Sequence, residues 1–229
     1  MFRKVWLIVV LLIALSIVRV EASTHTVMKT AGKSIDLVAS GFEVNTKAET
    51  VELSVSLPSS RHYRYRVKVE YYLEVIAGGL GSWAKAGVKY RTWEKTLYYL
   101  SEGAVGGRDY DAGTWTSPWY SGYGSSVSVS VQLRAEAKLG TAEFNSYAEA
   151  VVDAKVTLEV EYPDVVGLEV SGGGSTEPPP SVYEVWGSSF SARAYPDEGW
   201  EFKLWLLDGK QYMVILPSVT ISVSRDHTL

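Results

Sequence analysis

Apolar and polar residues alternate strictly along several segments of the chain. Between Tyr63 and Val75 the odd positions are apolar or aromatic and the even positions are mostly charged, and the same period of two recurs at Val127–Leu139 and Val152–Tyr162. A shorter copy, Val51–Leu57, ends at Pro58. Because a period of two puts successive side chains on opposite faces of a β-strand, each segment is predicted to be a strand with one buried and one solvated face.

Glycine-rich segments separate further strands. Residues 84–90 alternate in one phase and residues 93–99 in the other, which predicts a bulge at residues 91–92. The glycines of residues 78–81 are expected to join the preceding strand to residues 84–90 as a hairpin. Residues 103–107 form the next glycine-rich turn.

The fold class follows from the absence of helical periodicity beside these alternating segments. Strands that each have one polar face belong to antiparallel sheets that pack face to face, so residues 23–163 are predicted to form a long-stranded antiparallel β-sandwich of jelly-roll-like type. Strands of more than about ten residues exceed the usual length of about five or six. Such lengths indicate an extended, stiff module rather than a compact catalytic domain.

Residues 1–22 have the organisation of a signal peptide. Arg3 and Lys4 precede an apolar run, Val5–Val18, which is interrupted only by Ser16, and the residues up to Ala22 suit signal peptidase. The run is shorter than the roughly 20 residues that span a bilayer. We therefore expect export and cleavage after Ala22, with a secreted or cell-surface location; the alternative is that the segment stays as an anchor.

Composition narrows the possible partners. From residue 23 onward the chain has 19 basic and 25 acidic residues, a net charge of −6, which argues against nucleic acid as a partner. It has no cysteine, so packing and hydrogen bonds alone must stabilise it. The scarcity of Asn and Gln is the profile of a thermophile's envelope protein, with compositional drift as the alternative.

The C-terminal residues carry a family resemblance. A glycine-rich opening at residues 167–174, the turn Ala194-Tyr195-Pro196-Asp197-Glu198-Gly199-Trp200-Glu201-Phe202, a tryptophan at 205, Asp208-Gly209 and an alternating segment from Pro217 follow one another. In this order they resemble the divergent B-repeat of internalin-B type, a small β-rich extracellular module, over about residues 166–229. The resemblance implies a spacer or contact module of surface proteins without catalytic residues. Because the sequence stops before the closing Ala-x-Phe of that family, the module is expected to lack its last strand positions or to take them from another chain.

Local patterns in residues 164–229 predict β-structure independently of this resemblance. Pro196 and Gly199 mark a turn, apolar residues alternate at 202, 204 and 206, and Asp208-Gly209 predicts a type I′ hairpin before a strand at residues 212–216. Trp205, between Phe202 and this hairpin, is expected to be a core residue. Residues 171–181 are rich in Gly, Ser, Thr and Pro, which leaves a linker and a hairpin of the module as alternatives.

Candidate chemistry is sparse, and the sequence predicts no enzyme, cofactor or metal site. His25, His62 and His227 are not at metal-ligand spacing, and no nucleophile elbow, phosphate loop or dinucleotide fingerprint occurs. Asp109-Tyr110-Asp111 has too few oxygen ligands for calcium and is interpreted as a solvated turn. The acids that could form a glycosidase pair fall on outward strand faces, where a solvated surface is the ordinary explanation: Glu70, Glu74, Glu136, Glu159 and Glu161.

One aromatic loop, within residues 110–124, stands out as a candidate contact surface for a ligand or partner. Its aromatic residues are Tyr110, Trp115, Trp119, Tyr120 and Tyr123. Exposed aromatic rings offer rigid area for a protein partner or for a sugar ring, and the third alternative is that they pack in the core.

These observations favour a non-enzymatic secreted or cell-surface β protein that acts as an adhesin, envelope component or extracellular filament subunit. Its expected partners are other envelope proteins, copies of itself, or glycans. The alternative is a carbohydrate-binding module that uses the aromatic loop. Residues 23–30 would be a free N-terminal strand after cleavage, which could pair with the edge of a neighbouring copy, whereas the charges of Lys29, Lys33, Lys47 and Glu49 could block such pairing.

Overall fold

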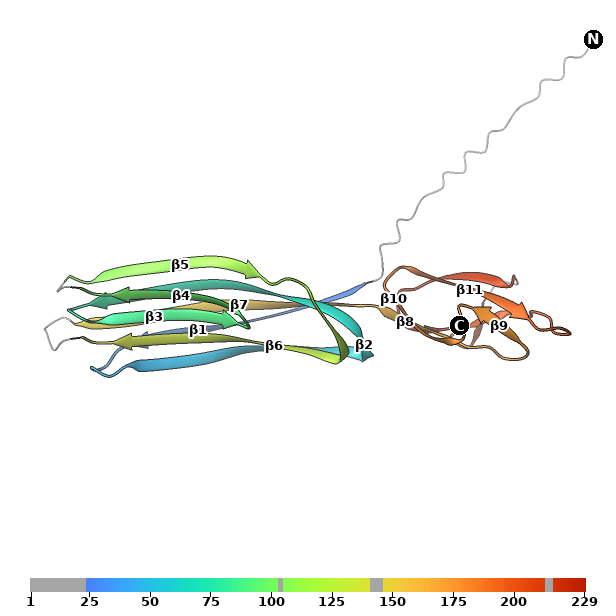
Figure 1. Ribbon diagram of the computed structural model, residues 1–229, viewed down its shortest axis with the longest axis horizontal. Coiled ribbons are helices and arrows are strands. Elements are labelled where there is room, and N and C mark those ends of the chain that lie inside the picture. The colour runs from blue at the N-terminus through green and yellow to red at the C-terminus, as the bar shows by residue number, and fades with distance from the viewer. Residues whose placement is uncertain (1–23, 103–104, 141–145, 213–215) are drawn as a thin grey trace, which may run out of the picture.

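The computed structural model describes residues 24–102, 105–140, 146–212 and 216–229; the predicted signal peptide, residues 1–22, lies outside them. These residues are all-β, without a helix. They form two units with separate hydrophobic cores that lie end to end (Figure 1). We call residues 24–163 the N-terminal unit and residues 164–229 the C-terminal unit.

Long antiparallel strands make up the N-terminal unit. In chain order they are β1 (His25–Val38), β2 (Asn45–Gly78), β3 (Trp83–Tyr90), β4 (Trp93–Leu100), β5 (Gly107–Thr116), β6 (Tyr120–Lys138) and β7 (Tyr147–Tyr162). One layer has the order β1, β7, second half of β2, β5, and the other has the order first half of β2, β6, β3, β4. Two four-stranded layers connected in this order are a jelly roll, so the fold expected for this region is confirmed.

The predicted alternating segments are strands in the structure. The inward residues of β2, β6 and β7 come from both layers and form one core, in which Val69, Leu133 and Leu158 are fully buried. On the outer faces, opposite charges pair across strands: Arg66 Nε lies 2.6 Å from Glu159, and Arg64 contacts Glu161. The side chains of Glu161 and Glu159 are only 15% and 20% exposed, so they are not the simply solvated surface that was expected.

β2 differs from the prediction, because Pro58 does not end it. Its pairing with β6 shifts register between Ser56 and Arg61, so Leu57–Ser60 have no partner in the ladder. Proline is tolerated at such an irregularity because its missing N–H is not needed there. The paired ribbon of β2 and β6 passes from one layer to the other at this point, at the end of the unit that faces the C-terminal unit (Figure 1).

Two predicted connections are wrong. Residues 79–82 do not close a hairpin, since β2 and β3 belong to different layers and the chain crosses between them with Gly79 and Gly81 at positive φ. Residues 91–92 are not a bulge; they form the two-residue turn of a β3–β4 hairpin, with Tyr90 opposite Trp93 and Arg91 at φ +52°. The glycines in the first case and the change of phase in the second located the connection but did not determine its topology.

The edges of the sandwich are closed by ion pairs. Lys33 of β1 lies 2.9 Å from Glu49 of β2, and Lys95 of β4 lies 2.5 Å from Asp111 of β5. Asp109–Asp111 therefore lie in a strand and not in the solvated turn that was expected. β1 pairs with β7 along its whole length, so the prediction of a free N-terminal strand is also wrong.

Short strands make up the C-terminal unit. They are β8 (Asp164–Leu168), β9 (Gly174–Glu177), β10 (Ser181–Val185), β11 (Ser189–Pro196), β12 (Trp205–Leu207), β13 (Lys210–Tyr212), β14 (Ser218–Ser222) and β15 (His227–Thr228). The sheets have the orders β10-β8-β15, β14-β11-β9 and β12-β13. All described pairings are antiparallel except that of β15 with β8.

The hairpin and the tryptophan of this unit are as predicted. Asp208 and Gly209 both have positive φ, as a type I′ turn requires, and they join β12 to β13. Trp205 is 5% exposed, and its indole Nε1 donates to the Leu216 carbonyl oxygen at 3.1 Å.

Other details of the C-terminal unit differ from the expectations. Residues 171–181 are neither a bare linker nor a hairpin, because β9 pairs with β11 and β10 pairs with β8. The alternation at residues 202–206 fails, since strand structure begins only at Trp205 and Leu206 is exposed. Residues 213–215 of the strand expected at 212–216 lie outside the described part. The chain's last residues pair with β8 of the same chain, and Leu229 is buried.

Candidate functional site: the joint between the units and the aromatic segment

The two units are joined with almost no intervening chain. β7 ends at Tyr162 and β8 begins at Asp164, so Pro163 alone separates a strand of one unit from a strand of the other. Because proline has a fixed φ, this connection has less freedom than an ordinary linker. We call the contacts around this point the joint.

Arg61 is the central side chain of the joint. The irregularity in β2 turns it toward the C-terminal unit, where it is 1% exposed. Its two terminal nitrogens donate to both carboxylate oxygens of Asp226, at 3.0 and 2.8 Å, and also to the Pro163 carbonyl oxygen at 2.9 Å and the Ser59 hydroxyl at 2.7 Å. Its cation lies 5.5 Å from the centre of the Tyr162 ring. A buried arginine paired in this bidentate way fixes both distance and orientation.

The pKa of each partner reflects this pairing. Hydrogen bonding to Asp226 raises the pKa of Arg61 against the opposing effect of burial. Burial by itself would raise the pKa of Asp226, but hydrogen bonds from Arg61 and from the Val165 amide outweigh it, and the pKa of Asp226 is lowered. Both groups are therefore held in their charged forms.

Two histidines add contacts across the joint. His25 Nε2 lies 2.7 Å from the buried Asp164 carboxylate, and its ring stacks on Tyr162 at 5.1 Å between centroids. His62 bonds to Glu184 through both its backbone amide, at 2.9 Å, and its ring Nδ1, at 2.8 Å. Within the described residues, no three His, Cys, Asp or Glu side chains gather in a metal-binding arrangement.

An arginine lies between two tryptophans on the surface of the joint. The guanidinium of Arg64 is 5.1 Å from the ring centre of Trp119 in the N-terminal unit and 5.9 Å from that of Trp186 in the C-terminal unit. Arg66 is 4.7 Å from the same Trp119 ring. These distances are typical of cation–π contacts, so the cluster adds attraction between the units.

The structure separates the five predicted aromatic residues: two are packed, two are exposed, and Trp119 is half-buried against Arg64 and Arg66. Trp115 stacks on Trp93 with centroids 4.6 Å apart, and Tyr120 packs against Tyr65 and against Arg91, whose cation is 4.1 Å from the Tyr120 ring centre. Both packed residues adjoin the main core.

Two of the aromatic residues are exposed: Tyr110 is 67% exposed and Tyr123 is 63% exposed. The Tyr123 ring contacts the His62 ring edge-on. The aromatic segment, residues 110–124, is not a single loop as predicted. It comprises part of β5, residues 117–119 and the start of β6. The five aromatic residues therefore do not form one contact surface; Trp119 and Tyr123 lie at the joint.

Sequence reasoning missed the residues that make the joint. Arg61 carried a usable signal, since it is a charged residue in the inward phase of the alternation that continues through Tyr63 and Tyr65. Asp226 carried none, because its partner lies 165 positions away in the chain.

Comparison with known proteins adds little to this picture. No family model and no curated protein matches the chain. Among solved structures, it is similar to "Structure of infectious bursal disease virus Gx strain", at 8% identity over 60% of this chain and 36% of that one, with a TM-score of 0.25. It is also similar to "Crystal structure of infectious bursal disease virus VP2 subviral particle", at 9% identity over 71% and 40%, with a TM-score of 0.23. The chain spans two fifths or less of these proteins, and the fold assignment rests on the strand order alone.

No helix among the described residues is long and apolar enough to cross a membrane.

Proposed function

We propose that this chain is a non-enzymatic, exported β protein of the cell surface whose role is mechanical: it serves as a stiff element of an adhesin, of the envelope or of an extracellular filament. The observation that carries the proposal is the joint, in which the buried Arg61 binds Asp226 across the two units. A protein that only needed two tethered modules would not require a buried charge pair between them. A joint fixed in this way suits a protein that transmits force or holds a spacing, because the length of such a protein must not change under load.

The shape of the molecule supports the same role. Both layers of the N-terminal unit run along the axis on which the C-terminal unit continues (Figure 1). β6 and β7 have 19 and 16 residues, and β2 crosses both layers with paired segments at residues 45–56 and 61–78, against a usual strand length of about five or six. Strands of this length make a rod.

Export and the assignment of the C-terminal unit complete the proposal. The charged start and short apolar run of residues 1–22 support export. The buried Trp205 and the Asp208-Gly209 hairpin support an internalin-B-type module. In this scheme the partners are envelope proteins or further copies of the chain.

Electron microscopy of the purified chain from Ser23 tests the rod. We expect straight particles in which the two units keep one angle, and a broad spread of angles would contradict the proposal.

Intact-mass analysis of material secreted by the producing cells tests export, with Ser23 expected as the first residue. Light scattering as a function of concentration tests association between copies.

A further inference from the structure

A shallow channel crosses the outer face of the layer that contains β1, β7, β2 and β5. Its volume is about 800 Å³. Each of the four strands contributes three consecutive residues to its lining: Gly32–Ser34, Asp153–Lys155, Glu70–Tyr72 and Ala112–Thr114. The channel therefore runs across the strands, and with a strand spacing of about 4.8 Å it is about 14 Å long.

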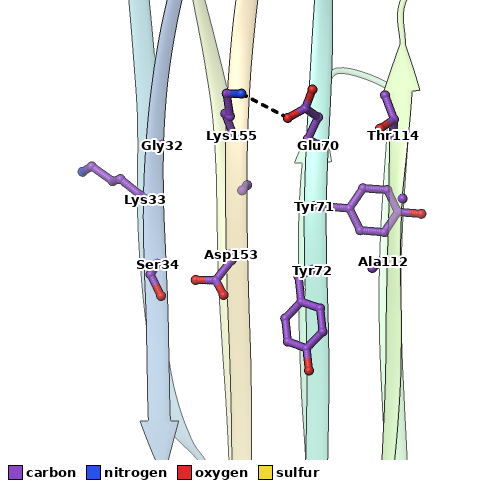
Figure 2. Close-up of a pocket in the computed structure, with 12 residues that line it drawn as sticks. Gly32, Lys33, Ser34, Glu70, Tyr71, Tyr72, Ala112, Thr114, Asp153 and Lys155 are labelled. Atoms are coloured by element: carbon purple, nitrogen blue, oxygen red, sulfur yellow. Dashed lines mark ion pairs between the residues drawn. The ribbon is translucent and has the colours of Figure 1, made fainter.

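Two rows of residues in register form the walls. One row is Gly32, Lys155, Glu70 and Thr114, and the other is Ser34, Asp153, Tyr72 and Ala112. Figure 2 shows the Lys155–Glu70 ion pair on one side and the Tyr72 ring on the other, pointing away from it. The main chain between the rows forms the floor.

Hydrogen bonds and ion pairs of the wall residues keep the two walls apart. The Tyr72 hydroxyl donates to Glu74 at 2.7 Å, which draws the ring away from Glu70. Glu70 in turn is held by Lys68 at 2.5 Å and by Lys155 at 3.3 Å. Below the floor, a Cβ at Gly113 would lie 2.8 Å from the Tyr71 hydroxyl oxygen, so a larger residue there would displace the end of the Tyr71 side chain.

The polar groups of the channel suit an uncharged, hydroxyl-rich ligand. Lys155 and Glu70 neutralise each other, and Lys33 is paired with Glu49. Among the described residues, the Asp153 carboxylate and the hydroxyls of Ser34 and Thr114 have no hydrogen-bond or ion-pair partner, so they are available as acceptors or donors. The Tyr72 ring adds a flat apolar surface beside them.

An extended peptide fits this site less well. Peptides that bind to sheets add a strand to an exposed edge and use its unpaired backbone groups. Here β7 and β2 are interior strands whose backbone groups are already paired in the ladders on both sides, so recognition must come from side chains.

We propose that this channel binds a short, uncharged oligosaccharide, with Tyr72 contacting the face of a sugar ring and Asp153, Ser34 and Thr114 bonding to its hydroxyls. This site is separate from the joint, and it shares residues 112–114 with the aromatic segment but none of that segment's aromatic side chains. It does not depend on the mechanical role proposed above, although a surface protein with such a site would attach to glycans.

A glycan array followed by calorimetric titration of the best neutral oligosaccharide tests the site, using the chain from Ser23. Tyr72→Ala and Asp153→Ala should each weaken binding about tenfold, which corresponds to the loss of one aromatic contact or one charged hydrogen bond. Ser34→Trp should abolish binding by filling the channel. The matched control is Ser130→Trp, an exposed position on β6 in the other layer, which should bind as the unmodified chain does.

The thermal midpoint of each variant shows whether the fold is intact. Loss of binding in Ser34→Trp with an unchanged midpoint, beside normal binding in Ser130→Trp, supports the channel. Three results would overturn the proposal: no neutral oligosaccharide binds, only charged glycans bind, or Ser34→Trp binds normally.

Discussion

Arg61 and Asp226 lie 165 positions apart in the chain and form a bidentate ion pair, with N–O distances of 3.0 and 2.8 Å, that connects the two units. The two side chains are unequal in exposure. That of Arg61 is 1% exposed and that of Asp226 is 45% exposed. Removing the carboxylate would leave a buried cation with only neutral hydrogen-bond partners, the Pro163 carbonyl and the Ser59 hydroxyl. Removing the arginine would leave a carboxylate that can reach water.

We therefore predict that Asp226→Ala lowers the free energy of unfolding by about 3 kcal/mol, because it leaves the buried guanidinium without its counter-charge. Urea unfolding followed by tryptophan fluorescence measures this change. The same variant should broaden the angle between the units in electron micrographs, since the joint loses its bidentate contact.

The neighbouring residue supplies the control for this prediction. Arg225 is 74% exposed at its side chain and reaches Asp208 only at 3.5 Å, so Arg225→Ala should change the free energy of unfolding by less than about 0.5 kcal/mol. If both variants unfold alike, the joint does not depend on the Arg61 pair.

Stability should fall in acid through Asp208 and Asp226. The pKa of Asp208 is lowered from its ordinary value of 3.8, chiefly by the Thr228 backbone amide and then by His227, and the pKa of Asp226 is lowered as described above. A group whose pKa is lower in the folded state contributes stability above its ordinary pKa and loses it as the pH falls through the folded value. Both contributions should thus be complete near pH 6 and be lost below about pH 4.

Urea unfolding at pH 6 and at pH 3 measures this loss. Asp208→Asn should show a smaller difference between the two pH values, because asparagine tolerates the positive φ of this position and cannot titrate. Asp197→Asn, at an exposed position, is the control and should behave as the unmodified chain. An equal difference in all three proteins would contradict the assignment.

The strands could be predicted from sequence because their period is a local property. Alternation over Val127–Leu139 and Val152–Tyr162 depends only on which residues face the core, and the structure buries the expected face. The connections at residues 79–82 and 91–92 could not be predicted, because a glycine or a change of phase shows where the chain turns and not which layer it enters. The joint was missed for a related reason, since an ion pair between β2 and residue 226 has no local signature. The channel was missed because it depends on the register of four strands.

Trp205 provides a test of the C-terminal core. Its ring is buried beside Phe202, at 5.6 Å between centroids, and its N–H is bonded. Trp205→Ala should cost about 3 to 5 kcal/mol in the free energy of unfolding, through lost burial and the cavity that remains. Leu206→Ala, at a residue that is 48% exposed, should cost much less. Equal costs in urea unfolding would contradict the burial of Trp205.

The two tryptophans of the aromatic segment should respond differently to substitution. Trp115 stacks on Trp93 against the core, so Trp115→Ala should cost about 3 kcal/mol or more in the free energy of unfolding. Trp119 contacts Arg64 and Arg66 at the surface of the joint, so Trp119→Ala should cost only about 1 kcal/mol. Thermal unfolding of both variants checks this order. The reverse order would show that Trp115 is available for a partner after all.

Gly140 should be among the least replaceable residues at the end of the N-terminal unit that is farther from the joint. A Cβ there would lie 2.1 Å from the carbonyl carbon of Gly81 and 2.2 Å from the Leu80 oxygen, so the connection between β2 and β3 would have to move. Because the obstacle is backbone, Gly140→Ala should destabilise the unit by about 1 to 3 kcal/mol. Gly41→Ala is the matched control, since a Cβ at Gly41 meets nothing within 4 Å, and it should be neutral or slightly stabilising through the unfolded chain. Chemical denaturation of the two variants decides the matter: if Gly140→Ala is as stable as Gly41→Ala, residues 79–82 are not packed against Gly140 as described.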